Sequence, residues 1–240
     1  MRKGTATMID VALVQRLAKF DTPTICNALE IVDPESRSKG FTKRPLICPF
    51  PDLPPFIGYA RTASIRATHP HELAGAEARE QRLSYYEYVA NGGPSPSIAV
   101  IQDLDGVDIG FGCFWGEVQS AVHKGLGCAG VITDGGIRDV PQWAPGLPVL
   151  AGSIVPSHGH VHLADFGREV RVAGMVVRSG DLIHADSHGA VVIPTDCAEK
   201  IPNACDLLER REAVILDIAR APGFTIKQLR QALQRQDEIH

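Results

Sequence analysis

The beginning of the chain combines helical spacing with a proline-rich stretch. After Thr7, a candidate N-cap, apolar side chains recur every three to four positions over residues 8–20, and this spacing predicts a helix. A second short helix is predicted after Thr24. Residues 33–55 then carry six prolines among Phe, Leu and Ile, which favours an extended segment that covers the domain over a flexible linker.

The centre of the chain predicts alternating strands and helices. Alternation of apolar and polar positions predicts a half-buried strand, helical spacing predicts a helix, and an unbroken apolar run is typical of a buried strand. In chain order, these patterns give a strand at 58–68, a helix at 72–90 that is ended by the run 91–94, a strand at 97–102, a helix from near Gly116 and a buried strand at 129–133. The last three elements form a strand, helix, strand unit.

Short β-rich pieces and long helices complete the chain. The pieces lie at residues 148–155, 161–164, 169–172, 175–178, 181–185 and 190–193. They predict a compact sheet or barrel-like layer. A long periodic helix over residues 196–220 and a further helix after Thr225 follow. No internal repeat is visible, so the sequence predicts one α/β domain over residues 1–240 with helical additions at both ends.

Composition and charge narrow the class of protein. The chain has 240 residues, 44% of them hydrophobic and 22% charged, as expected of a globular domain. A net charge of -4 without any run of Lys or Arg disfavours a nucleic-acid partner. No apolar stretch reaches the roughly 18 to 20 residues that a membrane helix requires, so no membrane contact is expected. Six cysteines without a CxxC pair disfavour a disulfide framework and fit a reducing cytoplasm.

The segment from Gly116 to Val140 carries the most informative chemistry. Gly116, Glu117, Val118 and Gln119 open the predicted helix, where amide hydrogens lack intrahelical acceptors and face outward at the positive end of the helix dipole. A substrate carboxylate can dock on such amides. Glu117 is also a candidate catalytic carboxylate that orients a proton-carrying water, although the dipole explains a Glu in a first helical turn equally well.

Arg138 and Asp139 follow the turn at residues 134–136. The planar guanidinium of Arg138 can bind a substrate carboxylate through two parallel hydrogen bonds, as a lysine cannot. Asp139 supplies an anionic oxygen, and Mg²⁺ commonly takes one or two protein carboxylates while water and substrate oxygens complete its shell. The dipeptide alone is also compatible with a surface pair that binds nothing. Arg138 is the candidate substrate anchor, and Asp139 is the candidate metal ligand.

Several short motifs stand in a fixed order along the chain. They are Asp21 to Thr24, Cys26 to Leu29, Gly116-Glu117, Gly130 to Asp139, Gly180 to Asp186 and Gly189 to Pro194. Together they resemble the RraA-like family, which includes class II 4-hydroxy-4-methyl-2-oxoglutarate aldolases and regulators of ribonuclease E. The resemblance covers a core of about residues 21–197 and leaves the terminal helices as extensions.

The resemblance implies a three-layer β/β/α sandwich of the swivelling-domain type, here with additional terminal helices. It also implies a homo-oligomer, either a trimer or a hexamer, with active sites between subunits. In that family the Gly-Glu turn amides and the arginine hold the substrate, and the following aspartate anchors Mg²⁺. Gly116 to Gln119 then become the substrate loop, Arg138 the substrate arginine and Asp139 the metal ligand, in agreement with the roles inferred from the residues themselves.

These inferences predict a cytoplasmic lyase that depends on Mg²⁺ or another divalent cation such as Mn²⁺. Arg138 and Glu117 would serve retro-aldol cleavage of a small 2-oxo acid, or decarboxylation of an oxaloacetate-like compound, with release of pyruvate. The chain departs from the aldolase pattern at Gln142, where catalytic members tend to carry Asp or Glu, and an amide cannot act as a charged ligand or proton acceptor. A non-catalytic regulator that binds ribonuclease E or another protein is the alternative.

Two groups of histidines offer further candidates. His158, His160 and His162 alternate, which predicts three imidazoles on one face of a strand. They could bind zinc as in a hydrolase, or simply form hydrogen bonds at a sheet surface or subunit contact. A second alternating set at residues 184–188 favours a structural or interface role over indirect support of the site.

Overall fold

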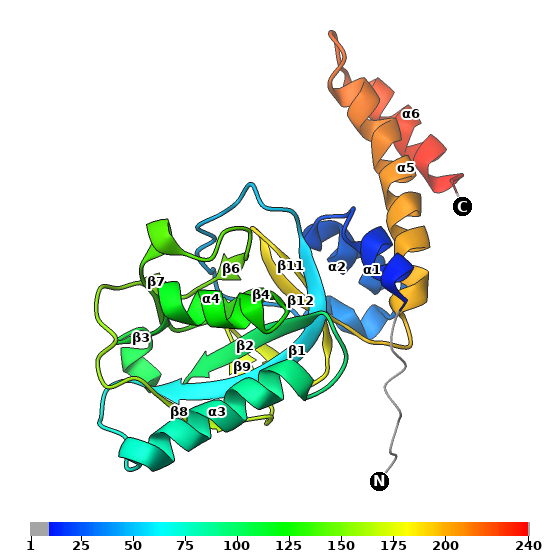
Figure 1. Cartoon of the computed structure of the whole chain (residues 1–240). Coiled ribbons are helices and arrows are strands. Elements are labelled where there is room, and N and C mark those ends of the chain that lie inside the picture. Colours follow the sequence, from blue (N-terminus) through cyan, green and yellow to red (C-terminus); the bar gives the residue numbers. More distant parts are fainter. Residues whose placement is uncertain (1–9, 240) are drawn as a thin grey trace.

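The computed structural model describes residues 10–239 and arranges them in three layers beside a projecting helical arm (Figure 1). The helices are α1 (Val11–Leu17), α2 (Thr22–Val32), α3 (Gly75–Asn91), α4 (Glu117–Gly125), α5 (Ile201–Ala219) and α6 (Ile226–Asp237), with 3-10 turns η1 (Pro34–Ser38), η2 (Gly106–Asp108), η3 (Val140–Gln142) and η4 (Ala198–Lys200). The strands are β1 (Phe56–Arg66), β2 (Ser97–Asp103), β3 (Cys113–Trp115), β4 (Cys128–Thr133), β5 (Gly136–Ile137), β6 (Val149–Leu150), β7 (Ser153–Ile154), β8 (His162–Phe166), β9 (Val170–Val172), β10 (Met175–Val177), β11 (Leu182–Asp186) and β12 (Gly189–Ile193).

The central layer is a sheet built around β1. Its strand order is β12-β11-β1-β2-β4-β6, and β8 also pairs with β1. The strands β1, β2, β4 and β6 pair in parallel, whereas β8, β11 and β12 each pair antiparallel with their neighbour. Every residue of β1 except Arg66 is buried. Such a continuous buried run is what a strand covered on both faces requires.

The two faces of the central sheet are covered by different layers. Ile57 near the start of β1 packs with α1, α2 and α5, and Ile65 near its end packs with α3 and β3. Ala60 points to the opposite face and packs with the β9–β10 hairpin through Val172 and Met175. Successive side chains of a strand point to opposite faces, so one strand contributes to both interfaces. This stacking confirms the predicted three-layer β/β/α sandwich.

Aspartates begin the two N-terminal helices. Asp10 caps α1, and Asp21 caps α2 by accepting the backbone N–H of Thr24 at 2.8 Å. The predicted second helix is confirmed, but it begins at Thr22 and not after Thr24, because Asp21 caps it and Pro23 fits the first turn, where no backbone N–H is needed. Thr7, the predicted cap of the first helix, lies outside the described residues.

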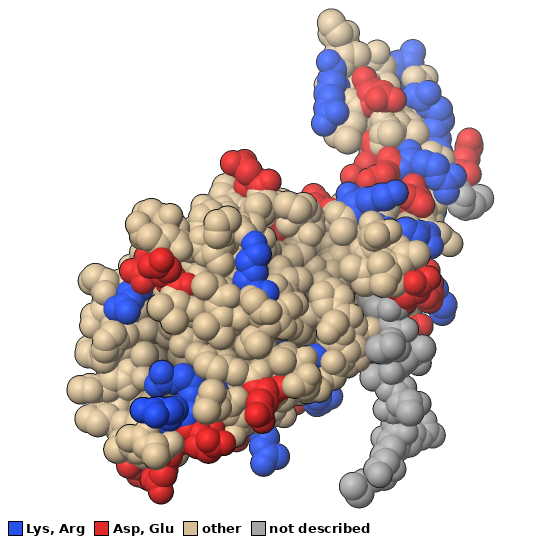
Figure 2. Space-filling model, viewed as in Figure 1, with Lys and Arg blue, Asp and Glu red and all other residues tan. Residues whose placement is uncertain are grey.

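The two C-terminal helices form a hairpin that projects from the body (Figure 1). A helix follows Thr225 as predicted, and Thr225 caps it. Only the first turns of α5 are buried, where Ile201 and Cys205 pack against α2. Figure 2 shows acidic and basic side chains interspersed along this arm. Among residues 10–239, no helix is both long and apolar enough to cross a bilayer.

The short β pieces beyond residue 148 do not form one compact layer. β8, β11 and β12 join the central sheet, while β9 and β10 form a separate hairpin. β6 extends the central sheet, and β7 completes a three-stranded sheet of order β3-β5-β7. The prediction of a single sheet or barrel-like layer is therefore wrong. β9 pairs with β10 and β11 pairs with β12 as neighbours in sequence, but β6, β7, β8 and β11 also pair with strands from earlier in the chain. Local alternation carries no information about those distant partners.

The polar residues at 184–188 tie α2 to β11. Asp186 accepts the backbone N–H groups of Thr22 at 2.7 Å and His188 at 2.8 Å, and the Thr22 hydroxyl lies 3.0 Å from Nδ1 of the buried His184. Burial raises the pKa of Asp186, but these donors outweigh it and leave the pKa below its ordinary value of 3.8. Burial also lowers the pKa of His184 to about 4, so its ring is neutral at neutral pH. The set has the structural role that its spacing favours.

Asp186→Asn removes the charged acceptor at this junction and is expected to lower the free energy of unfolding by about 1–3 kcal/mol at neutral pH. Because the folded-state pKa is depressed, the stabilisation is fully present above pH 3.8 and is lost as the pH falls through the folded-state value. Denaturant unfolding of both proteins from neutral pH to about pH 3 measures this difference. A difference that stays constant over the whole range would contradict the assigned charge.

Candidate active site

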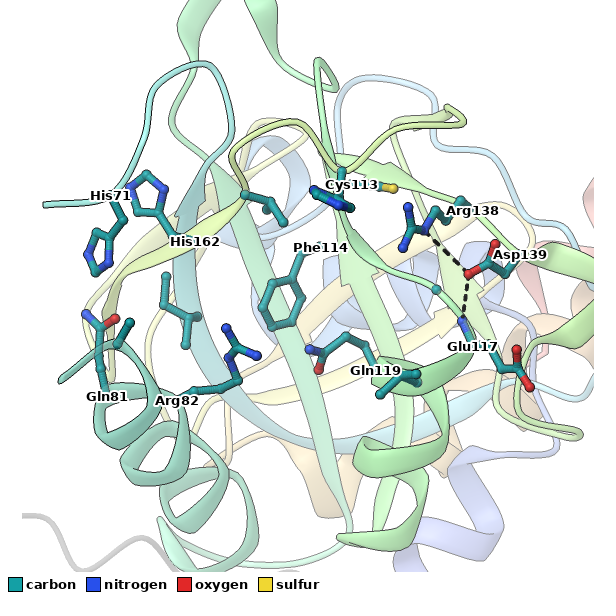
Figure 3. Close-up of a pocket in the computed structure, with 16 residues that line it drawn as sticks. His71, Gln81, Arg82, Cys113, Phe114, Glu117, Gln119, Arg138, Asp139 and His162 are labelled. Atoms are coloured by element: carbon teal, nitrogen blue, oxygen red, sulfur yellow. Dashed lines mark hydrogen bonds and ion pairs between the residues drawn. The ribbon is translucent and has the colours of Figure 1, made fainter. Parts of the chain in front are cut away.

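Parallel pairing of β3 with β5 assembles the predicted site. The backbone N–H of Arg138 donates to the Trp115 carbonyl oxygen at 3.0 Å, which continues this pairing beyond β5. Gly116, the residue after β3, therefore lies beside Arg138 and Asp139. Together with the first turn of α4, these residues line a cavity of about 350 Å³ (Figure 3). The structure thus brings together all the residues that the sequence nominated for substrate and metal binding.

The lack of a side chain at Gly116 permits the closest contact of the site. A Cβ atom at this position would lie 2.6 Å from Oδ2 of Asp139 and 3.3 Å from Cγ of Arg138. The φ angle of Gly116 is -163°, an extended value that any residue adopts, so the requirement for glycine is steric. The space lets Oδ2 accept the backbone N–H of Glu117 at 3.3 Å and lie 3.4 Å from Nε of Arg138.

Asp139 has a strained backbone. Its φ and ψ angles are 55° and 37°, the left-handed region that side chains other than glycine seldom adopt. The following turn η3 holds this conformation, because the Gln142 N–H donates to the Asp139 carbonyl oxygen at 2.9 Å. Among the described residues, Oδ1 of Asp139 has no hydrogen-bond partner, and the side chain is 41% exposed. Strain of this kind is a feature of ligand-binding positions. Asp139 lines the cavity and keeps one carboxylate oxygen unpaired.

The first turn of α4 presents backbone donors to the same cavity. Gly116 is the N-cap and supplies no side-chain acceptor. The part of the chain that the structure describes contains no acceptor for the amides of Val118 and Gln119. These N–H groups and the helix dipole favour an anion at this end. The Glu117 carboxylate is exposed at the rim and extends away from Arg138 (Figure 3).

Buried aromatic residues hold Gln119 in place. His123 Nδ1 lies 2.7 Å from the Gln119 carbonyl oxygen, and His123 Nε2 lies 2.8 Å from the Tyr85 hydroxyl. Burial lowers the pKa of His123 to about 4, so the neutral ring donates from Nδ1 to the carbonyl and accepts at Nε2 from Tyr85. The Tyr86 hydroxyl donates to Gln119 Oε1 at 2.9 Å. This side-chain bond leaves the NH₂ group of the amide for the cavity.

The other end of the cavity is lined by Gln81, Arg82 and His71, which sequence reasoning missed, and by His162, which it considered only as a zinc ligand or a hydrogen-bonding surface residue. Arg82 and Gln81 come from α3, His162 begins β8, and His71 belongs to the loop between β1 and α3 (Figure 3). The His71 and His162 rings stack with centroids 4.3 Å apart. Partial burial, followed by the neighbouring His162, lowers the pKa of His71. No local motif joins these segments, so only the fold identifies them as neighbours.

The alternating histidines do not form the predicted strand face. Gly159 has a φ angle of 53°, which turns the chain between His158 and His160, and β8 begins only at His162. His158 and His162 line the cavity, whereas His160 does not. Within residues 10–239, no three His, Cys, Asp or Glu side chains are placed to hold a metal ion together. The histidine-only zinc site is therefore not formed by this chain.

Comparison with known proteins places most of the chain in one family. Residues 22–192 match the family described as RraA-like, Aldolase/RraA. The Methanocaldococcus jannaschii protein MJ0644, which is uncharacterized, is 34% identical over 103 residues, covering 42% of this chain and 50% of the relative. A Halalkalibacterium halodurans protein that is provisionally named a 4-hydroxy-4-methyl-2-oxoglutarate aldolase is 30% identical over 88 residues, covering 36% and 42%. The chain thus spans half or less of the length of these curated relatives.

Solved structures share the fold. An uncharacterized protein from Pseudomonas syringae superposes with a TM-score of 0.70 at 20% identity, covering 96% of this chain and 98% of that chain. RraAS2 from Streptomyces coelicolor, described as an unusual member of the RNase ES inhibitor RraA protein family, superposes with a TM-score of 0.66 at 24% identity, covering 86% and 96%. At 20% and 24% identity, these superpositions show that the proteins share a fold and show nothing about a shared activity.

Gly116→Ala is expected to fold with little change in unfolding temperature, because its backbone is extended, but to push the Asp139 carboxylate away from the Glu117 amide and Arg138 Nε. A crystal structure of the variant measures this displacement. Gly125→Ala in the same helix is the matched control, since its added Cβ meets no atom within 4 Å. If Asp139 kept both contacts in Gly116→Ala, the steric role assigned to Gly116 would be wrong.

Proposed function

The chain belongs to the RraA-like family, and we propose that it is a divalent-metal-dependent carbon–carbon lyase acting on a small 2-oxo acid. The observation that carries this proposal is the convergence of Arg138, the unpaired Asp139 oxygen and the free α4 amides on one cavity. The aldolase name of one relative supports the reaction class. The reaction is retro-aldol cleavage of a 4-hydroxy-2-oxo acid or decarboxylation of an oxaloacetate-like acid, and either one releases pyruvate or a close analogue.

The residues at the cavity suit Mg²⁺ or Mn²⁺ better than a cation whose ligands must all come from protein side chains. Asp139 would hold the cation through Oδ1, which the surrounding donors leave unpaired. A hard cation of this type accepts a single protein carboxylate when water and substrate oxygens complete its shell. Its chemistry when bound is to polarise the 2-oxo group and to offset the charge of an enolate.

Arg138 and α4 hold the substrate carboxylate. Nε of Arg138 faces Asp139, so the two Nη groups of the guanidinium are left for a carboxylate. The amides of Val118 and Gln119 approach the same anion along the helix axis. These donors are fixed by the fold before the substrate arrives, so they need no reorganisation as charge moves during the reaction.

Proton transfer completes either reaction. In the retro-aldol reaction, the C4 hydroxyl loses its proton, the C3–C4 bond breaks and C3 of the resulting enolate takes up a proton. In decarboxylation, the bond to the departing carboxylate breaks, carbon dioxide leaves and the same enolate is protonated. We assign water-mediated proton delivery to Glu117, whose carboxylate lies at the solvent-exposed rim of the cavity.

We also propose that the chain works as a homo-oligomer, a trimer or a hexamer, whose subunits meet near this cavity. The apolar side chain of Val118 is 71% exposed at the mouth and has no cover within the subunit. A neighbouring subunit there would exclude water and strengthen the electrostatic interactions of the site.

One observation favours a second candidate function, a non-catalytic regulator that binds ribonuclease E or another protein. Gln142 is exposed beside Asp139 and offers an amide where the aldolase pattern has a carboxylate. A solved structure with the same fold is described as a member of an RNase ES inhibitor family. This function requires the fold and a binding surface but no turnover.

The lyase proposal predicts pyruvate release from 4-hydroxy-4-methyl-2-oxoglutarate or oxaloacetate in the presence of Mg²⁺, and loss of that activity in EDTA. A coupled lactate dehydrogenase assay measures pyruvate, and an enzyme-free sample with the same Mg²⁺ corrects for spontaneous decarboxylation. Restoration by excess Mg²⁺ or Mn²⁺ distinguishes cation removal from inactivation. Absence of turnover on both substrates would favour the regulator.

Asp139→Asn is expected to lower turnover by roughly 10²- to 10³-fold, because the variant loses the anionic ligand that positions the cation. Asparagine tolerates the left-handed backbone, so the free energy of unfolding should change by less than about 1 kcal/mol. A Mg²⁺ titration of pyruvate release gives both the maximal rate and the half-saturation concentration. Asp52→Asn, an exposed change outside the cavity, is the control. Unchanged values of both parameters in Asp139→Asn would exclude Asp139 as the metal ligand.

A further inference from the structure

The cavity has two chemically different ends. Glu117 and Asp139 supply the carboxylates among the described residues that line it, and both lie at the α4 end. The opposite end is lined by Arg82, Gln81 and the stacked histidine pair, and it carries hydrogen-bond donors without a lining carboxylate. Phe114 lies between the two ends and forms an apolar floor (Figure 3). A ligand that fills this cavity therefore meets donors at its head, an apolar middle and donors again at its tail.

Arg82 is available to a ligand. Within residues 10–239, no acidic side chain forms an ion pair with it, although the same helix carries Glu77, Glu80 and Glu87. Its side chain reaches toward the cavity from α3 (Figure 3). A guanidinium binds carboxylate and phosphate groups in the same planar, two-pronged manner. The lining thus offers a second arginine at the end remote from Arg138.

Tyr86 orients the Gln119 side chain, whose NH₂ group is the second donor at this end. Tyr86 lies four residues after Arg82, on the same face of α3, and its hydroxyl donates to Gln119 Oε1 at 2.9 Å. Since the amide oxygen is occupied, the Gln119 NH₂ group is the part that remains for a ligand. Gln119 lines the cavity between the α4 amides and α3. Tyr86 acts through Gln119 and is a positioning residue.

We propose that Arg82, together with the Gln119 amide and the His71–His162 pair, forms a subsite for a second anionic group on the tail of the substrate. This subsite rests on the proposed function, in which Arg138 and α4 take the 2-oxo acid head. It selects 2-oxo acids that end in a carboxylate or in a phosphate-like group over those that end in a methyl group. Arg82 is the residue that determines this specificity.

Calorimetric binding with Mg²⁺ present tests the subsite. Oxalate reports on the head site, 2-oxoglutarate on head and tail together, and 2-oxopentanoate on a chain of equal carbon number with a methyl end. None of these ligands has a bond that the proposed reaction cleaves, so binding is measured without turnover. Arg82→Gln should weaken 2-oxoglutarate about tenfold, the lower range for a charge-assisted bond because the side chain is exposed. Oxalate and 2-oxopentanoate should bind as in the parent.

Two further variants separate recognition from structure. Arg79→Gln removes an exposed arginine of the same helix that does not line the cavity, and it should leave all three affinities unchanged. Tyr86→Phe should weaken 2-oxoglutarate by a smaller factor than Arg82→Gln while oxalate binding persists. 2-Oxo-4-phosphonobutanoate, compared with 2-oxoglutarate, identifies the tail group as phosphonate-like or carboxylate, and both affinities should fall in Arg82→Gln.

The outcomes distinguish the two proposals. If the parent binds oxalate but Arg82→Gln leaves its preference for 2-oxoglutarate over 2-oxopentanoate unchanged, the tail subsite is wrong and the head site stands. An equal loss for all three ligands would show that Arg82 only supports the fold of the cavity, which also overturns the subsite. If the parent binds neither oxalate nor the 2-oxo acids, the proposed function fails and the subsite fails with it.

Discussion

The double pairing of β1 is the constraint on which the remaining structure depends. One edge of this strand pairs with β2, and the other edge pairs with β11 in its first half and with β8 in its second half. Both faces are buried, so a shift of register by one residue would exchange the helix-facing and hairpin-facing side chains along the whole strand. The same pairing places His162 opposite Arg66 at the end of β1, beside the loop that carries His71. The central strand therefore also positions one wall of the cavity.

The two ends of the cavity are built in different ways. The head end is built by backbone groups and by residues adjacent in sequence, held by the β3–β5 pairing and by the buried Tyr85–His123 pair. The tail end is built by side chains from separate elements: α3, β8 and the loop between β1 and α3. Under the proposed function, fixed backbone donors suit the 2-oxo acid head, which every substrate of the reaction shares. Side chains can change without disturbing the backbone, and they suit the part of the substrate that varies.

The sequence located the residues that line the α4 end of the cavity, and the family resemblance gave the three layers. Gly116, Arg138 and Asp139 were predictable because a helix start and a strand end have local signals, and the family motifs supported them. Arg82 could not be found in this way, since an arginine on a polar helix normally faces solvent. The histidine alternation misled because Gly159 adopts a left-handed turn that no spacing rule reveals. The strands after residue 148 were located individually, but β6, β7, β8 and β11 pair with strands from earlier in the chain, which local patterns do not reveal.

The backbone of Asp139 has a consequence for the evolutionary history of such a chain. Its left-handed conformation is compatible with aspartate, asparagine and glycine and unfavourable for most other residues. Replacement by asparagine changes a single base in the codon and is compatible with the same turn, so under the proposed function a gene lineage can lose the metal ligand in one step while the fold persists. The fold can then be inherited without the activity. A shared architecture in this family therefore does not by itself establish the proposed reaction, and the residue at position 139 of each member is one feature that has to be compared.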